Sequence, residues 1–178
     1  MKEIIDKIKK GGVGVLPTDT LYGLCCSVFH KDSIERIYEI KKRNPKKPVL
    51  VLIGSKRDLK IFGAKVPKKL KRFWPGKVSI ILPCSSFPYI HRGGNSIGFR
   101  LPKLKWLRKL LKKTGPLVAP TCNPEGKEPA KTISQAKNYF PSLDFYLDKG
   151  KLGGKPSTLI KLEKGEIIVL RKGAVKIC

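Results

Sequence analysis

Val13-Gly-Val-Leu-Pro-Thr-Asp-Thr-Leu-Tyr-Gly-Leu24 joins a short apolar run directly to a cluster of polar side chains. Comparable apolar runs, bounded by Gly or Pro, recur along the chain. Runs this short and this apolar are typical of strands that are covered on both faces of a sheet. They predict buried strands at 13–17, 49–53, 78–82, 117–119 and 167–170.

Apolar side chains repeat at helical spacing between these runs, at 4–8, 34–38 and 104–111. Asp32 is placed to cap the second of these segments. Pro102 precedes the third, and proline suits the first turn of a helix. The three segments therefore predict helices that pack against the strands.

Two local signals complete the secondary structure. Thr132 with Gln135 forms the capping-box pattern that opens a helix, and Lys164-Gly165 predicts a hairpin turn between the last two strands. Helices mixed with buried strands predict a three-layer α/β or α+β domain, and the hairpin predicts a mixed sheet. At 178 residues, with no repeat or obvious linker, the chain is expected to form one domain over residues 1–178.

The composition is that of a globular protein, since 40% of the residues are hydrophobic. The start of the chain has no apolar run resembling a signal peptide. No stretch approaches the roughly 18 apolar residues that a membrane helix requires. We therefore expect a cytoplasmic protein that has no contact with a membrane.

The cysteines lack the spacing of a zinc site or a disulfide framework, because no CxxC pair is present. They are Cys25, Cys26, Cys84, Cys122 and Cys178. We predict reduced thiols that serve as small apolar side chains, and no metal site.

The net charge of +26 comes from 39 Lys and Arg against 13 Asp and Glu. A field of this kind attracts nucleotides and RNA, with an affinity that falls steeply as salt rises. Lysine-rich surfaces are also typical of heat-adapted proteins. Because the charges are scattered along the chain, the composition leaves both interpretations open.

Polar segments follow the apolar strands, at the place where open α/β sheets bind ligands. The first combines Thr18, Asp19, Thr20 and Tyr22 with Gly23, which would permit a tight turn. An ordinary turn with side-chain caps is the alternative.

A second polar segment places Arg43 at the end of a predicted helix, where it could hold a phosphate or carboxylate in a fork. Cations at a helix C-terminus are also favoured by the macrodipole. In a third segment Arg100 is expected to point the same way as Ser96 and Gly98. A buried arginine needs an anion, so Arg100 is either a ligand-binding group or half of an internal ion pair.

A fourth segment carries Thr121 and Asn123 out of a strand into a loop, where they could grip a phosphate or a base. Neither GxxxxGK[ST] nor GxGxxG is present, so neither P-loop nor dinucleotide chemistry is supported.

Taken in order, these segments resemble the YrdC domain family of threonylcarbamoyl-AMP synthases. Seven motifs stand in register over nearly the whole chain. They are Pro17–Leu24, Lys41–Pro48, Trp74-Pro-Gly76, Arg100-Leu-Pro102, Pro120-Thr-Cys-Asn123, Ser157-Thr158 and Arg171-Lys-Gly173.

The resemblance implies a twisted, open, mixed sheet flanked by helices, with a large basic cavity. It implies a nucleotidyltransferase that joins L-threonine, bicarbonate and ATP, with Mg²⁺, into threonylcarbamoyl-AMP and pyrophosphate. A threonylcarbamoyl-transferase complex would then modify tRNA, and tRNA itself would be met indirectly or weakly. The resemblance is to the short, single-domain form of the family.

The resemblance also implies roles for individual residues. Threonine would be held by Thr20, Arg100, the backbone near Ala119, and Ser157. ATP would be held by Arg43, Lys47, Ser96, Thr121, Asn123 and Arg171. Arg43 and Lys41 would act as electrostatic stabilisers, and no side chain is assigned as a general acid or base.

The chain departs from the family pattern at two positions that bear on substrate affinity. Thr121-Cys122 replaces Ser-Ala, which keeps the hydroxyl, and Leu52 stands where some members carry a histidine. The main alternative is a YrdC-like module that binds RNA without synthase activity, because a fold alone does not decide function. A module that makes a carbamoyl-adenylate for another acceptor is a third possibility.

Overall fold

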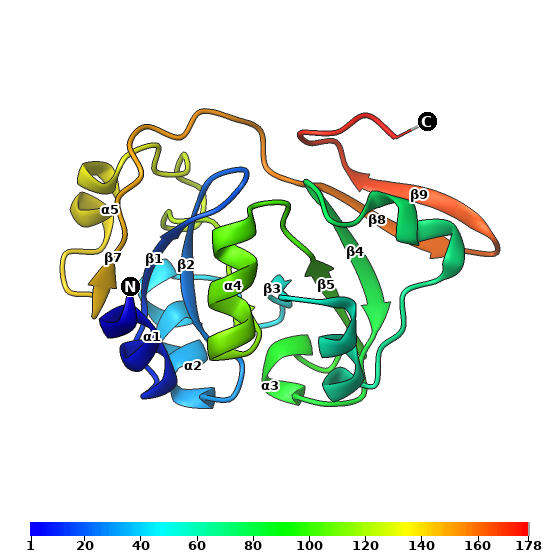
Figure 1. Cartoon of the computed structure of the whole chain (residues 1–178), viewed down its shortest axis with the longest axis horizontal. Coiled ribbons are helices and arrows are strands. Elements are labelled where there is room, and N and C mark those ends of the chain that lie inside the picture. Colours follow the sequence, from blue (N-terminus) through cyan, green and yellow to red (C-terminus); the bar gives the residue numbers. More distant parts are fainter. Residues whose placement is uncertain (178) are drawn as a thin grey trace.

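The computed structural model describes residues 1–177. In this part of the chain nine strands form one sheet, in the order β7-β1-β2-β6-β3-β5-β4-β8-β9 (Figure 1). The strands are β1 (Gly14–Pro17), β2 (Tyr22–Ser27), β3 (Val51–Leu52), β4 (Val78–Pro83), β5 (Ser96–Arg100), β6 (Leu117–Val118), β7 (Phe145–Tyr146), β8 (Thr158–Glu163) and β9 (Glu166–Arg171).

Helices cover both faces of this sheet. They are α1 (Lys2–Lys9), α2 (Lys31–Lys41), α3 (Pro88–His91), α4 (Lys105–Thr114) and α5 (Ile133–Tyr139), with the 3-10 segments η1 (Lys56–Phe62) and η2 (Lys68–Phe73). Val15 and Val51 belong to an apolar cluster with α2. Leu16 and Leu52 belong to a second cluster with α1 and α4. Because neighbouring strand residues point to opposite faces, the two clusters make the predicted three-layer arrangement.

The sheet is mixed, as the sequence predicts. β1 pairs with β2 antiparallel, whereas β3 pairs with β5 in parallel. The predicted hairpin is confirmed: β8 and β9 pair antiparallel, and both turn residues have a positive φ, 48° at Lys164 and 81° at Gly165. Two consecutive positive φ values are the mark of the turn that matches the twist of a hairpin.

Two strand predictions are wrong in part. The run at 167–170 is not covered on both faces: β9 is the last strand of the sheet, and Val169 and Leu170 are 39% and 47% exposed. The run at 49–53 contributes only Val51 and Leu52 to the ladder.

The helix starts also differ from the sequence prediction. α2 begins at Lys31 after His30, with no side-chain cap, so Asp32 lies inside its first turn. α4 begins at Lys105, which leaves Pro102 outside the helix. Thr132 does cap α5, because its Oγ1 accepts a hydrogen bond of 3.2 Å from the backbone N–H of Gln135.

The cysteines that the structure describes, Cys25, Cys26, Cys84 and Cys122, are all free and buried, as predicted. Burial raises the pKa of Cys25 and of Cys122 to about 12, so both thiols stay protonated. Cys178 lies outside the described residues. Within residues 1–177, the helices are too short or too polar for any of them to cross a bilayer.

The close approach of β1 to β7 gives a test of the fold. Gly14 faces Phe145 in the ladder, and a Cβ on Gly14 would overlap the ring and the carbonyl oxygen of Phe145. Gly14→Ala should therefore lower the free energy of unfolding by about 1–3 kcal/mol, the usual cost of overpacking. Urea denaturation measures this change.

Gly153→Ala is the matched control, since a Cβ on Gly153 would meet no atom within 4 Å. Its effect should stay within about 0.5 kcal/mol. Equal stability of the two variants would contradict the packing of β7 against β1.

Candidate functional site

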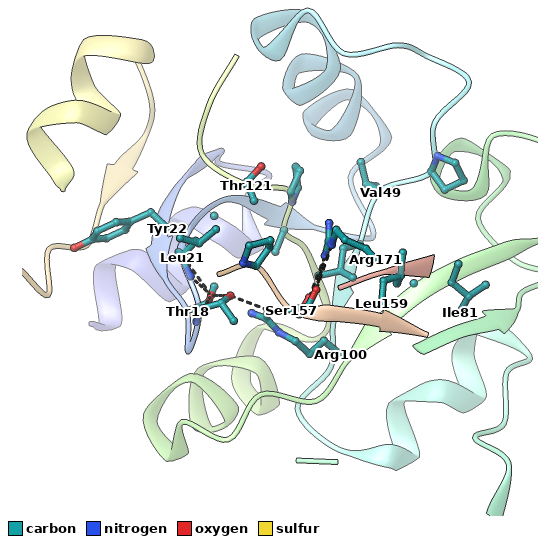
Figure 2. Close-up of a pocket in the computed structure, with 18 of the residues that line it drawn as sticks. Thr18, Leu21, Tyr22, Val49, Ile81, Arg100, Thr121, Ser157, Leu159 and Arg171 are labelled. Atoms are coloured by element: carbon teal, nitrogen blue, oxygen red, sulfur yellow. Dashed lines mark hydrogen bonds between the residues drawn. The ribbon is translucent and has the colours of Figure 1, made fainter. Parts of the chain in front are cut away.

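A cavity of about 310 Å³ lies among the β1–β2 turn, β5, the loop after β6 and the last two strands (Figure 2). Eight of the eleven predicted site residues line it. They are Thr20, Arg43, Ser96, Arg100, Ala119, Thr121, Ser157 and Arg171. The structure therefore brings together residues from segments up to 151 positions apart in the sequence (Thr20 to Arg171).

The first polar segment forms the wall of the cavity because it folds back as a strand. Gly23 lies inside β2, not in a turn as predicted, and bridges to Thr121 in the loop after β6. Two backbone hydrogen bonds of 2.9 Å fix that loop, from Leu24 N–H to the Pro120 carbonyl and from Cys122 N–H to the Tyr22 carbonyl. The turn itself spans Thr18 to Leu21, where Thr18 Oγ1 donates to the Leu21 carbonyl at 2.7 Å.

Arg100 lines the cavity and forms an internal ion pair, while its role as a ligand-binding group stays a prediction. It lines the cavity with Ser96 and Gly98, as the strand alternation predicts. It also forms an internal ion pair with Asp19, at 3.1 Å between Nη2 and Oδ1, and both side chains are 4% exposed. The contact lacks hydrogen-bond alignment, because Asp19 Oδ1 makes no hydrogen bond within residues 1–177.

The Arg100 guanidinium still has hydrogen-bonding capacity. Its Nη1 donates to Thr20 Oγ1 at 2.9 Å, but its Nε has no hydrogen-bond partner among the described residues. Burial lowers the pKa of Arg100, and the charge of Asp19 opposes that effect. A buried cation with an unsatisfied N–H in a cavity wall is suited to an anionic ligand.

Arg171 lies on the other side of the cavity and is tied to Ser157. Its Nη2 donates to the Ser157 carbonyl at 2.9 Å, and Ser157 Oγ lies 2.7 Å from Ser79 Oγ. Ser79 was missed by the sequence analysis, and its only signal is a polar residue inside the apolar run of β4. Gly173 belongs to the family motif Arg171-Lys-Gly173, and the structure gives a reason for it. A Cβ on Gly173 would overlap the backbone at Pro156 and Ser157.

Arg43 lines the cavity at the end of α2. Its Nη2 donates to the Pro48 carbonyl at 2.9 Å, while its Nε has no hydrogen-bond partner among residues 1–177. The guanidinium lies 5.8 Å from the centre of the Tyr38 ring. Arg43 is therefore held by one hydrogen bond and one cation–π contact, and part of its hydrogen-bonding capacity is not used within the described residues.

The other three predicted site residues lie outside the lining and support the loop after β6. Lys41 is buried, and its Nζ donates to the Thr121 carbonyl at 2.6 Å and to the Asn123 carbonyl. Desolvation and the nearby charge of Arg43 lower the pKa of Lys41 to about 8.

Lys47 and Asn123 support the same loop through other contacts. Lys47 pairs with Glu125 at 2.7 Å, and the Asn123 side-chain amide donates to two carbonyls of its own loop. Direct ligand contacts for these three residues stay predictions, as they do for the eight that line the cavity.

Of the three departing residues, Leu52, Thr121 and Cys122, only Thr121 lines the cavity, and it keeps the hydroxyl. Leu52 is fully buried in the cluster with α1 and α4, so it does not line the cavity. Cys122 is buried beneath the loop, and Thr121 alone reaches the wall.

The cavity has a cationic lining, with three arginines and no Asp or Glu among its residues. The larger basic cavity that the resemblance implies stays a prediction. Within residues 1–177 no three His, Cys, Asp or Glu side chains gather as metal ligands. Arginine forks and hydroxyls are the groups that the lining offers to an anion.

Comparison with known proteins identifies the family and the fold. The family model Sua5_yciO_yrdC, described as telomere recombination, matches residues 6–173. The threonylcarbamoyl-AMP synthase of Marinobacter nauticus is 34% identical over 166 residues, covering 88% of this chain and 87% of that protein.

Two solved structures superpose on nearly the whole chain. Pyrococcus abyssi Sua5, in a crystal structure with L-threonine, has a TM-score of 0.87 and 27% identity, covering 96% of this chain and 53% of that one. Escherichia coli YciO has a TM-score of 0.85 and 25% identity, covering 97% of this chain and 88% of that one. The chain spans about half the length of the Sua5 structure. From its residues, its sheet and these matches, the chain belongs to the Sua5/YciO/YrdC family.

Proposed function

We propose that this protein is a threonylcarbamoyl-AMP synthase. It joins L-threonine, bicarbonate and ATP into threonylcarbamoyl-AMP and pyrophosphate, in the cytoplasm, for the threonylcarbamoyladenosine modification of tRNA. The observation that carries the proposal is the convergence of Arg43, Arg100 and Arg171 on one cavity. The name of the Marinobacter nauticus relative and the threonine in the Sua5 crystal structure support the same reading.

The reaction needs positive charge more than it needs a nucleophilic side chain. The threonine amine first adds to bicarbonate with loss of water, which gives a carbamate. A carbamate oxygen then attacks the α-phosphorus of ATP, and the bond to the bridging oxygen of the β-phosphate breaks to release pyrophosphate. Both partners of that attack are anions, so preorganised cations that hold them together supply most of the rate gain.

The cavity offers two places for these anions. Arg100, with Thr20 beside it, would hold the threonine carboxylate through its guanidinium. Arg43 and Arg171, with Ser96 and Thr121, would hold ATP. Mg²⁺ would enter with ATP, whose phosphates carry the charge that it neutralises.

An RNA-binding module without synthase activity is the second candidate. The net charge of +26 favours it, because such a field binds phosphate backbones without sequence preference. Transfer to tRNA by a partner complex is compatible with either reading.

Substrate dependence separates the two candidates. We expect pyrophosphate release from ATP to require threonine and bicarbonate together, and to proceed without RNA. A coupled pyrophosphate assay, with each component omitted in turn, measures this. Formation of ADP, or turnover indifferent to threonine, would remove the synthase proposal and leave the RNA-binding module.

Substitutions of Arg43 and of Arg100 should change different kinetic constants. Arg43→Ala should lower kcat about 30- to 1,000-fold, because losing a donor preorganised for the transition state costs about 2–4 kcal/mol. Arg100→Lys should mainly raise the KM for threonine, because the carboxylate it holds keeps its charge through the reaction. Lysine is chosen there because alanine would leave Asp19 buried and unpaired.

Steady-state kinetics with threonine and ATP varied separately makes this measurement. Arg36→Ala is the matched control, since Arg36 is 40% exposed, pairs with Asp144 and does not line the cavity. If Arg43→Ala changes only the threonine requirement, the two anion sites are assigned the wrong way round.

The lowered pKa of Lys41 should make the stability of the protein depend on pH. Its pKa is about 8 in the native protein and 10.5 when unperturbed, so between these values the unfolded chain holds one more proton. Native stability therefore rises with pH in that window, by up to about 3 kcal/mol. Lys41→Met should lack this rise. The free energy of unfolding of the wild type, relative to that of the variant, should therefore increase from pH 8 to pH 10.5 in urea denaturation.

Thiols and tyrosines of the unfolded chain also titrate in this range, but both proteins share them. The charge of Lys41 lowers the pKa of Cys122, so its loss does not bring that thiol, with a pKa of about 12, into the window. The variant should also show a higher KM for ATP at an unchanged kcat, because Lys41 fixes the loop that carries Thr121. A constant stability gap across the pH range would show that Lys41 is not desolvated as described.

A further inference from the structure

A second concavity, of about 740 Å³, lies between η1 and α4 and shares no lining residue with the cavity. We refer to it as the α4 groove. Its lining residues are Gly54, Ser55, Lys56, Arg57, Leu101, Lys105, Arg108, Lys109 and Lys112. Six of these nine residues carry a positive charge, and none carries a negative one.

The charges of the α4 groove are not neutralised within the chain. Across residues 1–177, none of its six cations forms an ion pair with a carboxylate. The acid nearest in sequence, Asp58, accepts hydrogen bonds from the backbone N–H of Gly54 at 2.8 Å and from the Ser55 hydroxyl at 2.8 Å. Arg108 Nε is buried and makes no hydrogen bond within the same part of the chain.

Helix α4 arranges four of these cations in a row. Arg108 and Lys109 follow Lys105 by three and four positions, and Lys112 follows them by four and three, which places all four on one side of the helix over about 10 Å. The buried leucines of α4 occupy its other side. The helix has no acidic residue, so its lysines and arginine repel one another, and Lys105 stands at the positive end of the helix dipole.

This arrangement differs from a surface that is simply rich in lysine. Heat-adapted surfaces organise their lysines into networks with acidic partners, and the α4 groove has none. A row of unneutralised cations lowers the stability of the helix that carries it. An external anion would remove that repulsion.

We propose that the α4 groove binds the phosphate backbone of RNA. A repeating polyanion fits a row of cations on α4 joined by two more on η1, whereas a single small anion would leave most of them unneutralised. No aromatic side chain lines the groove to stack on a base. Recognition is therefore through phosphates and independent of sequence.

An anionic membrane surface fits the groove less well. Peripheral helices bind bilayers by burying an apolar face alongside their charges. The only bulky apolar residue in the lining is Leu101, which is itself 5% exposed. The site goes beyond the proposed synthase activity, since none of its residues lines the cavity.

Two triple variants of equal charge test the proposal. Lys105→Gln/Lys109→Gln/Lys112→Gln changes the groove, and Lys31→Gln/Lys68→Gln/Lys131→Gln changes three exposed lysines elsewhere. Each variant has a net charge of +23 (26 − 3). Binding of an unmodified, fluorescently labelled tRNA transcript is followed by anisotropy between about 50 and 200 mM salt, a range over which phosphate contacts lose most of their affinity.

The groove variant should bind the transcript at least about tenfold more weakly than the wild type, and its slope of log K against log salt should be shallower by about two to three. The control variant should keep most of the wild-type affinity. Equal losses in both variants would show that net charge alone attracts RNA, and would overturn the proposal. An unchanged groove variant, or no binding by the wild type, would also overturn it.

Vesicles containing anionic lipid serve as the competing probe. If the groove variant loses binding to vesicles but not to the transcript, the groove is a membrane surface and the proposal is wrong. Pyrophosphate release is measured on the same samples and should be unchanged in both variants. Because the wild-type assay needs no RNA, failure of the synthase proposal and failure of the groove proposal are observed separately.

Discussion

The cavity depends on the buried ion pair between Arg100 and Asp19. Asp19 lies in the turn between β1 and β2, and Arg100 ends β5, which is separated from β2 in the sheet by β6 and β3. The pair therefore ties a peripheral hairpin to the middle of the sheet. Taking two charges out of water is costly, so removing either partner would leave the other uncompensated. This constraint fixes the turn, and the turn positions Thr20.

The other two arginines of the cavity are held by backbone carbonyls and not by an acid. Arg43 and Arg171 each donate to one backbone carbonyl, of Pro48 and of Ser157, which fixes the direction of the guanidinium. Neither has an acidic partner among the described residues. Cations held in place without neutralisation need little reorganisation when anions arrive, which is the condition for electrostatic catalysis. The α4 groove also leaves cations unneutralised, but its lysines are exposed and lack such fixed geometry.

The sequence predicts what is local or periodic. Apolar runs predict the strands, Lys164-Gly165 predicts the β8–β9 turn, and the alternation in β5 predicts that Arg100 and Ser96 share a face. The remaining features depend on contacts between distant segments. The sequence predicts that Lys41 is a cation at the end of a helix. It is buried because it contacts the loop after β6, at Asn123, 82 residues later in the chain.

The local sequence also does not predict which distant side chain a buried polar residue contacts. Nothing near Arg100 in sequence indicates that Asp19, rather than a ligand alone, is its counter-ion. Ser79 becomes meaningful only beside Ser157, 78 residues away. The family resemblance supplied the candidate site residues, but only the structure separates the eight in the wall from the three that support the loop behind it.

The most direct test of the central claim compares two ligands that differ only at the carboxyl group, which is charged in one and a neutral amide in the other. L-threonine and L-threoninamide are titrated into the protein in a calorimeter. If the Arg100 guanidinium binds a carboxylate, L-threonine should bind about tenfold or more tightly than the amide, since a hydrogen bond to a charged group contributes about 1.5–3 kcal/mol. Equal affinities for the two ligands would contradict the assignment of Arg100 as the carboxylate site.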